Sequence, residues 1–403
     1  TDRLDLYRAA AQRLLETGHA YYCYCTEEEL EAQRAEATAK GVAFKYNGRC
    51  CQLTAEERAA KEKESSKKVI RFHIPPGIGN VVVDDLVRGR VEFDSEGLGD
   101  FIIVKSDGVP AYNFAVVIDD YNMKMTHIIR AEEHLPNTPR QILIYQALGY
   151  EMPKFAHISM ILGPDRTKLS KRHGATSVTQ YQEQGYLPDA LVNYLALLGW
   201  SPEEEREVYS PKELCQVFSL DRVAKNPAVF DNDKLKWLNG TYIRQKDISE
   251  ITQMVLPYLR EGGYAEGDPQ GQALEKLQQI VAAVRDHLEV LSQINQHVEV
   301  FFNDQIQLTD EETKAVLQQE QIPQVMEAFR QKLEEMTVLD VETVQQTLKK
   351  MPKELGLKPK QVLFPIRIAL TGKGAGPELF NLIPILGKER VLKRLENTLN
   401  QAK

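Results

Sequence analysis

A basic segment near the middle of the chain has the residue types that bind phosphate. Residues 168–172 read Lys-Leu-Ser-Lys-Arg and follow a loop that contains Gly163 and Pro164. Two lysines on either side of a serine can clamp a polyphosphate, because ammonium groups neutralise the charge that develops when the α-phosphorus is attacked. The preceding apolar run, 158–162, is typical of a strand, and phosphate sites lie at the carboxyl edge of such strands. The alternative is a solvated basic loop.

The elements that would position this segment predict an α/β domain. Three apolar runs are strand candidates: 112–118, 126–130 and 155–162. A helical pattern after Pro136 separates the second candidate from the third, and this order fits a doubly wound parallel sheet. The block at about 20–110, with a helix capped by Thr26 and Glu29, indicates a small α+β module. Beyond residue 245 the pattern is that of long amphipathic helices.

Composition places the chain among large folded proteins. Its 403 residues predict two to four domains, and 42% hydrophobic with 27% charged residues argues against disorder. No apolar run reaches the ~20 residues that cross a bilayer, and no leader precedes Thr1, so we expect a cytoplasmic protein without a membrane partner. The odd number of cysteines, 5, fits reduced thiols or a metal site. The net charge of −8 does not exclude RNA, because RNA binding depends on local basic faces.

Several collinear stretches resemble the bacterial glutamyl-tRNA synthetases, which are class I aminoacyl-tRNA synthetases. The segment 168–172 is similar to the glutamyl form of the KMSKS signature of that class. The other matching stretches are YYCYC at 21–25, GDFIIVKSDGVPAYNFA at 99–115, IRAEEHLPNTP at 129–139, LGWSP at 198–202 and LFPIRIALTGKGAGPEL at 363–379. Their common order is far more specific than any one of them, and the resemblance covers the whole chain.

The resemblance implies a Rossmann-like class I catalytic domain whose N-terminal half is missing, with an inserted α+β module and an all-α C-terminal region. The implied domains are the catalytic remainder at 1–20 and 111–165, the acceptor-stem-binding module at 21–110, the KMSKS-loop and stem-contact domain at 166–244, and the helical anticodon-binding region at 245–403.

The resemblance also implies which residues of the basic segment take part in catalysis. In the family the second lysine of this loop contacts ATP, so Lys171 is assigned that role and Lys168 is expected to assist. Ser170 and Arg172 are expected to shape the catalytic loop. ATP is then a substrate, and Mg²⁺ accompanies it.

Two positions match residues that hold the amino acid in the family, Tyr112 and Arg130. Arginine suits a carboxylate, because its planar guanidinium offers paired donors that lysine lacks. Glu133 and His134 match a segment that lines the ATP pocket. The alternatives are a core aromatic at Tyr112 and an exposed ion pair of Arg130 with Glu132 or Glu133.

Some family members bind zinc through Cys-x-Cys, 24 residues, and then Cys-x-His. Cys23, Cys25 and Cys50 fit this spacing, but the fourth position is Gln52, which is a poor zinc ligand. Cys51 is an alternative fourth ligand, although adjacent cysteines rarely reach one ion. The sequence therefore leaves open whether zinc is bound or the site has lost its metal.

The C-terminal region resembles the part of bacterial relatives that binds the anticodon. Lys358 and Lys360 belong to a group of lysines that precedes the 363–379 stretch, and Arg367 lies on the helix that approaches the anticodon in relatives. We expect these three residues to contact tRNA. A solvated basic face is the alternative.

The family's other ATP signature, HIGH, does not occur in the sequence. We therefore expect a glutamate–tRNA ligase that is inactive as the chain stands. Its reaction would activate L-glutamate with ATP to glutamyl-adenylate and transfer glutamate to the 3′ end of tRNA(Glu), with tRNA(Gln) as an open second substrate and a monomer as the implied state. The alternative is a non-catalytic tRNA-binding protein derived from a synthetase.

Overall fold

The computed structural model describes residues 2–64, 67–175, 177–308 and 310–401. They form two compact units. The first unit comprises Thr1–Lys168, Leu197–Arg206 and Gln216–Phe230, and the second comprises Leu169–Ala196, Glu207–Cys215 and Asp231–Lys403. The basic segment 168–172 therefore begins at the end of one unit and continues in the other. The domain boundaries expected from the sequence stay predictions.

The strands belong to the first unit. They are β1 (Ala20–Cys23), β2 (Val69–Phe72), β3 (Asn80–Asp85), β4 (Gly89–Asp94), β5 (Phe101–Val104), β6 (His127–Ala131), β7 (Lys154–Ile158), β8 (Ile161–Leu162) and β9 (Ala228–Val229). One sheet has the order β1-β2-β5 and is antiparallel, another has the order β4-β3-β7-β6, and β8 pairs with β9. In the four-stranded sheet β3, β7 and β6 are parallel, while β4 is antiparallel to β3. The predicted parallel sheet is thus confirmed, and β3 of the 21–110 block is part of it.

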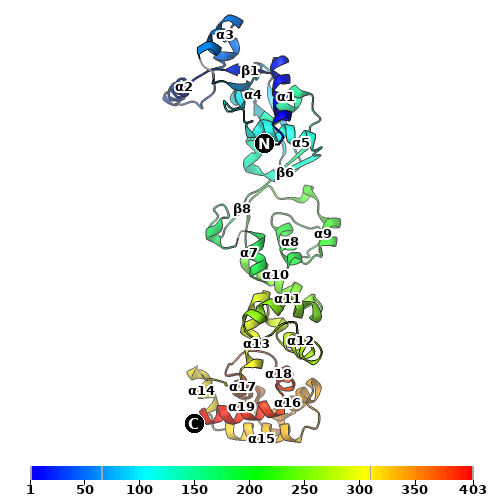
Figure 1. The fold of residues 1–403 in the computed structure, drawn as a ribbon. Coiled ribbons are helices and arrows are strands. Elements are labelled where there is room, and N and C mark those ends of the chain that lie inside the picture. Colours follow the sequence, from blue (N-terminus) through cyan, green and yellow to red (C-terminus); the bar gives the residue numbers. More distant parts are fainter. Residues whose placement is uncertain (1, 65–66, 176, 309, 402–403) are drawn as a thin grey trace. The chain divides into compact units, whose positions relative to one another are not determined.

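Nineteen α-helices lie within the described residues. They are α1 (Leu4–Glu16), α2 (Glu27–Ala39), α3 (Ala55–Glu64), α4 (Ser95–Leu98), α5 (Tyr112–Asn122), α6 (Thr138–Leu148), α7 (Val178–Glu183), α8 (Pro188–Leu197), α9 (Pro211–Val217), α10 (Asn232–Gln245), α11 (Ile248–Glu261), α12 (Gln272–Val284), α13 (Ile294–Phe302), α14 (Glu311–Leu317), α15 (Ile322–Glu335), α16 (Val341–Leu355), α17 (Pro359–Thr371), α18 (Leu379–Leu386) and α19 (Lys388–Gln401). Figure 1 shows α1, α2 and α5 with the strands of the first unit.

The strand predicted at 112–118 is wrong, because this run forms the first part of α5. Phe114, Val117 and Ile118 are buried, and their spacing of three and four residues places them on one face of a helix. A short apolar run has no reliable period, so its side-chain pattern fits either a strand or a helix. The run at 155–162 is also not one strand, since it divides into β7 and β8.

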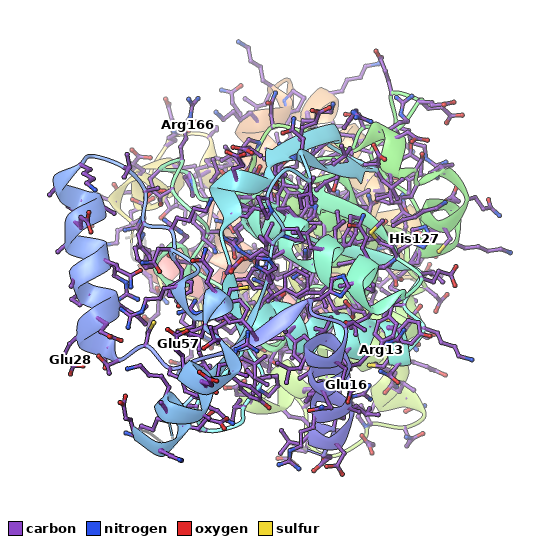
Figure 2. All side chains as sticks on the ribbon, turned by 90° about the horizontal axis from the view of Figure 1, so that it is seen from above. Arg13, Glu16, Glu28, Glu57, His127 and Arg166 are labelled. Carbon is purple, nitrogen blue, oxygen red and sulfur yellow. The ribbon has the colours of Figure 1, made fainter. Side chains whose placement is uncertain are left out.

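The core of the first unit is where α1, α5 and α6 meet the sheets. Leu14 of α1, Phe114 of α5, Ile144 of α6 and Val83 of β3 are all fully buried in one cluster. The capping box predicted at the start of α2 is present, with the Glu29 amide donating to the Thr26 hydroxyl at 3.3 Å. No residue of α2 is buried, and the helix stands clear of the rest of the first unit in Figure 2, where Glu28 marks its first turn.

The helices from α10 onward account for the regular structure of the C-terminal region. They are amphipathic and pack in pairs such as α16 with α18 and α17 with α19. This confirms the helical pattern predicted beyond residue 245. None of the helices in the described residues is both long enough and apolar enough to span a membrane.

Candidate functional site

Arg130 lies near the carboxyl end of β6, and the protein itself uses most of its donors. Its Nε donates to His157 Nε2 at 3.1 Å, and Nη2 donates to Thr138 Oγ1 at 2.9 Å and to Gln141 Oε1 at 2.7 Å. Gln141 in turn donates to the side chain of Asn113 at 2.9 Å. Among the described residues no hydrogen bond reaches Arg130 Nη1, so this edge of the guanidinium is the part that can meet a carboxylate.

The alternative of an ion pair between Arg130 and its neighbouring glutamates is wrong. Glu132 accepts from Arg88 Nη2 at 2.5 Å and from the Met160 amide at 3.1 Å. Glu133 accepts instead from Lys168 Nζ at 2.7 Å. Glu132 therefore binds Arg88 and the backbone that follows β7, and Glu133 binds the first residue of the basic segment.

The contact between Lys168 and Glu133 joins two residues that the sequence assigned to the ATP site. Both side chains are substantially exposed, and the Lys168 ammonium holds the pKa of Glu133 below its usual range. His134 lies beside Glu133 on the short 3-10 helix η2 (Glu132–Asn137), and its ring is 5.8 Å from that of Tyr112. The buried Nδ1 of His134 has no hydrogen-bond partner in the described part of the chain.

Tyr112 is not a core aromatic, because 53% of its surface is exposed. It occupies the first turn of α5, and its neighbour Asn113 belongs to the Arg130 hydrogen-bond chain. The exposed ring of Tyr112 therefore lies beside His134 at the surface of the first unit. Tyr112, Arg130, Glu133, His134 and Lys168 all belong to the first unit.

The remaining residues of the basic segment belong to the second unit. Lys171, Arg172 and His173 form the 3-10 helix η3 (Lys171–His173). The Ser170 amide lies 3.1 Å from His173 Nδ1 and Arg172 Nε lies 3.2 Å from His173 Nε2, and a neutral imidazole accepts one of these two hydrogen bonds at a time. His173 therefore organises the loop, and Lys171 is left exposed at its surface.

Three of the four clustered cysteines meet, as the spacing predicted. The Sγ atoms of Cys23, Cys25 and Cys50 all lie within 4.8 Å of one another. The hydroxyl of Tyr46 is 3.5 Å from Cys23 Sγ and 3.3 Å from Cys25 Sγ. Cys51 is not among the thiols that meet, although it packs against their cluster, and the Tyr46 hydroxyl contacts two of the three.

The polar groups of this cluster influence one another. Hydrogen bonding to Cys25 and Cys50 lowers the pKa of the Cys23 thiol, whereas hydrogen bonding to Cys23 raises that of Cys25. Burial raises the pKa of the Tyr46 phenol. Gln52, the position that the spacing assigned to a fourth ligand, is exposed.

In the C-terminal region Lys358 and Lys360 are exposed at the start of α17. The Lys360 ammonium lies 5.7 Å from the centre of the Phe364 ring. Arg367 is largely covered, and its Nη1 donates to the carbonyls of Gly376 at 3.0 Å and Pro377 at 2.6 Å. The two lysines are free to meet a phosphate backbone, while Arg367 shapes the loop that follows its helix.

Comparison with known proteins shows which family the chain belongs to. Residues 1–237 match the family model for "tRNA synthetases class I (E and Q), catalytic domain", and residues 250–399 match an "Anticodon binding domain". A glutamate–tRNA ligase of Desulforamulus reducens is 52% identical over 99% of this chain and 83% of its own length. The chain belongs to the glutamate–tRNA ligase family. Glutamate–tRNA ligase 1 of Caldicellulosiruptor saccharolyticus is also 52% identical, over 98% of this ligase and 81% of the relative.

Solved structures agree with this assignment. A glutamate–tRNA ligase from Elizabethkingia meningosepticum, in complex with its amino acid, superposes with a TM-score of 0.88 at 30% identity, over 100% of this ligase and 83% of that chain. The resemblance and the fold class drawn from the sequence are thereby confirmed. The expectation of an inactive ligase and the alternative of a non-catalytic tRNA-binding protein gain no support, because curated ligases match almost the whole of this chain.

Sequence reasoning missed the residues that hold Arg130 in place. They are Asp85, Asn113, Thr138, Gln141 and His157. It also missed Tyr46 beside the thiols and His173 within the basic loop. None of these has a recognisable spacing to its partner, although a histidine within the apolar 155–162 run is an unusual residue for a buried strand.

Proposed function

We propose that the chain activates L-glutamate with ATP and then esterifies the 3′ end of tRNA(Glu). In the first step a carboxylate oxygen of glutamate attacks the α-phosphorus of ATP, and pyrophosphate leaves. In the second step the terminal ribose hydroxyl attacks the glutamyl carbonyl, and AMP leaves. Mg²⁺ enters with ATP and neutralises part of the phosphate charge.

The observation that carries the proposal is the contact of Lys168 with Glu133 beside Arg130. Glu133 follows β6, at the carboxyl edge of the parallel strands β3, β7 and β6, and Lys168 reaches it from beside Leu162 at the end of β8, which belongs to another sheet. Ligands of parallel α/β sheets bind at the carboxyl edge where Glu133 lies. Arg130 Nη1 and Tyr112 supply a carboxylate partner and a covering ring, and the orphaned His134 Nδ1 supplies a further polar contact.

Pyrophosphate exchange with glutamate, ATP and tRNA tests the proposal. We expect glutamate-dependent exchange and aminoacylation of tRNA(Glu). Charging of purified tRNA(Gln) in parallel shows whether the enzyme accepts both tRNAs, and sedimentation of the chain with and without tRNA tests the proposed monomer. Binding of tRNA without pyrophosphate exchange would contradict the proposal and support a non-catalytic tRNA-binding protein.

We also propose that the thiol cluster binds one zinc ion, held by Cys23, Cys25 and Cys50. Three thiols within reach of one tetrahedral ion fit zinc. The Tyr46 hydroxyl, which its raised pKa keeps as a neutral phenol, is proposed to donate a hydrogen bond to a zinc-bound thiolate. We propose a structural site, because the thiols pack against the partly buried Leu30, Leu53 and Val69 and none of the residues proposed to hold substrate belongs to this cluster. Packing of reduced thiols without a metal is the alternative.

Replacing Cys25 with serine is expected to remove zinc from the purified protein. Elemental analysis should fall from about one ion per chain to none. The loss of binding should destabilise the folded chain by about 4 kcal/mol if free zinc is 1,000-fold above its dissociation constant. Cys215→Ser is the matched control, since Cys215 is exposed and outside the cluster. Tyr46→Phe should weaken zinc retention, and an unchanged retention would show that the Tyr46 hydrogen bond does not support the site. Absence of zinc from the unaltered chain would contradict the site.

The lysines at the start of α17 are proposed to contact the tRNA backbone. Changing both Lys358 and Lys360 to alanine should weaken tRNA binding and reduce its salt dependence by about one unit of log–log slope for each lysine–phosphate interaction that is removed. Filter binding over a salt series measures both quantities. Lys314→Ala with Lys332→Ala, an equal change of charge on α14 and α15, is the control. Equal slopes for the two double variants would show that Lys358 and Lys360 lie outside the RNA interface.

A further inference from the structure

We infer that the buried pair of Asp85 and His157 positions the guanidinium of Arg130 for the amino-acid substrate. The inference rests on the proposed role of Arg130 in glutamate binding and assigns a positioning role to two further residues. Asp85 ends β3, His157 lies in β7 and Arg130 lies in β6, so one sheet holds all three. Asp85 and His157 are 72 residues apart in the sequence.

The hydrogen bonds determine which nitrogen of His157 carries the proton. Arg130 Nε can only donate, so His157 Nε2, which lies 3.1 Å away, must accept with its lone pair. The proton is then on Nδ1, which donates to Asp85 Oδ2 at 2.6 Å. A carboxylate that only accepts stabilises this tautomer. Asp85 therefore sets the state of the imidazole that anchors Arg130.

The environment keeps this arrangement in place. The side chains of Asp85 and His157 are both fully buried. Burial lowers the pKa of His157, and the opposing effect of Asp85 does not cancel it, so the imidazole stays neutral. If His157 Nε2 also carried a proton, its N–H would face the Nε–H of Arg130, and the hydrogen bond between the two side chains would be lost. The neutral state is thus the one in which the guanidinium can be held.

Asp85 itself is satisfied by several donors besides the imidazole. It accepts from the backbone amides of Val87 at 2.9 Å, Arg88 at 2.8 Å and His157 at 3.0 Å. A buried carboxylate is costly unless it is hydrogen-bonded, and an apolar pair could fill the same space at less cost. A fully satisfied pair whose imidazole bonds the arginine proposed to hold glutamate is what a positioning role requires.

The consequence for Arg130 is geometric. His157 holds Nε, while Thr138 and Gln141 hold Nη2, so the plane of the guanidinium is determined and Nη1 points away from these three partners. Loss of the His157 contact would free the plane to rotate about the remaining Nη2 bonds. Glutamate would then meet a mobile donor rather than an ordered one.

Two amide replacements of His157 separate positioning from packing. Gln places a polar atom near the position of Nε2 and can still accept from Arg130, whereas Asn places one near Nδ1 and can still donate to Asp85. Calorimetry with L-glutamate on the full chain should show about tenfold weaker binding for His157→Asn and a change within about twofold for His157→Gln. Both variants should lose thermal stability, because His157→Gln removes the bond to Asp85 and His157→Asn removes the contacts of Nε2 with Arg130 and Thr138.

Arg130→Lys and a spectrum of the unaltered chain complete the test. Imidazole ¹⁵N shifts should show His157 protonated at Nδ1 and not at Nε2, and the reverse overturns the inference even if the variants fail to fold. If His157→Asn and His157→Gln lose glutamate affinity equally and Arg130→Lys also loses it, the positioning inference is overturned while the proposed role of Arg130 stands. Unchanged affinity in Arg130→Lys overturns the proposed role of Arg130 and the inference with it.

Discussion

Replacing Lys171 with alanine is expected to lower the rate of glutamate-dependent pyrophosphate exchange by about 10²- to 10³-fold, the usual effect of losing one preorganised donor to transition-state charge. Lys171 is exposed on η3, and the role proposed for its ammonium is to neutralise the phosphates that separate as the adenylate forms. The effect should fall on kcat, because the charge on pyrophosphate grows only as the bond breaks. The KM for glutamate should change little.

Steady-state exchange with varied ATP and varied glutamate checks this expectation. Lys154→Ala is the matched control, since Lys154 is an exposed lysine at the opposite end of β7 from the site. Lys171→Arg should retain part of the rate, because the charge remains but its position changes. A fall of less than about threefold for Lys171→Ala would remove this residue from the phosphate site.

The second large effect is expected at Arg130. Arg130→Lys should raise the KM for glutamate by about 10- to 100-fold, because a charge-assisted hydrogen bond contributes about 1.5–3 kcal/mol. Lysine has no Nε–H fork and loses the anchors to His157, Thr138 and Gln141. The KM for ATP should stay near its original value, since no nucleotide contact is assigned to this side chain.

Arg140→Lys provides the control for this replacement. Arg140 lies on α6 near the site, but it donates to the carbonyl of Pro136 and lies over the ring of Phe101. The same change of chemistry there should leave the KM for glutamate unaltered. Equal rises of the KM for glutamate and for ATP in Arg130→Lys would show a collapsed site rather than the removal of one substrate-binding group.

Local signals in the sequence were sufficient for much of this protein. The basic segment, the Cys-x-Cys pair and the Thr26–Glu29 capping box each depend on residues a few positions apart, and the backbone geometry of loops and helix ends determines what they can do. The helices beyond residue 245 show their apolar faces at a helical period. Collinear motifs added the family, which the comparisons confirmed.

The apolar run 112–118 shows where local signals fail. Its composition suits a strand, yet it forms α5, because the side chains of Phe114, Val117 and Ile118 fill one face against α1, α6 and the sheets. Packing partners distant in sequence decide between the two states when the run is short. The same limit applies to the 155–162 run, which the structure divides between two sheets.

The basic segment was recognisable from its own residues, because its lysines resemble phosphate ligands. The sequence also determined the family of the protein and the three thiols of the proposed zinc site. Only the tertiary structure decided that Lys168 pairs with Glu133, that Tyr46 faces the thiols, and that His157, bonded to Asp85, accepts from Arg130. These partners lie on different strands and loops, where no spacing rule connects them. Their proximity results from sheet pairing and core packing, which depend on the whole chain rather than on any segment of it.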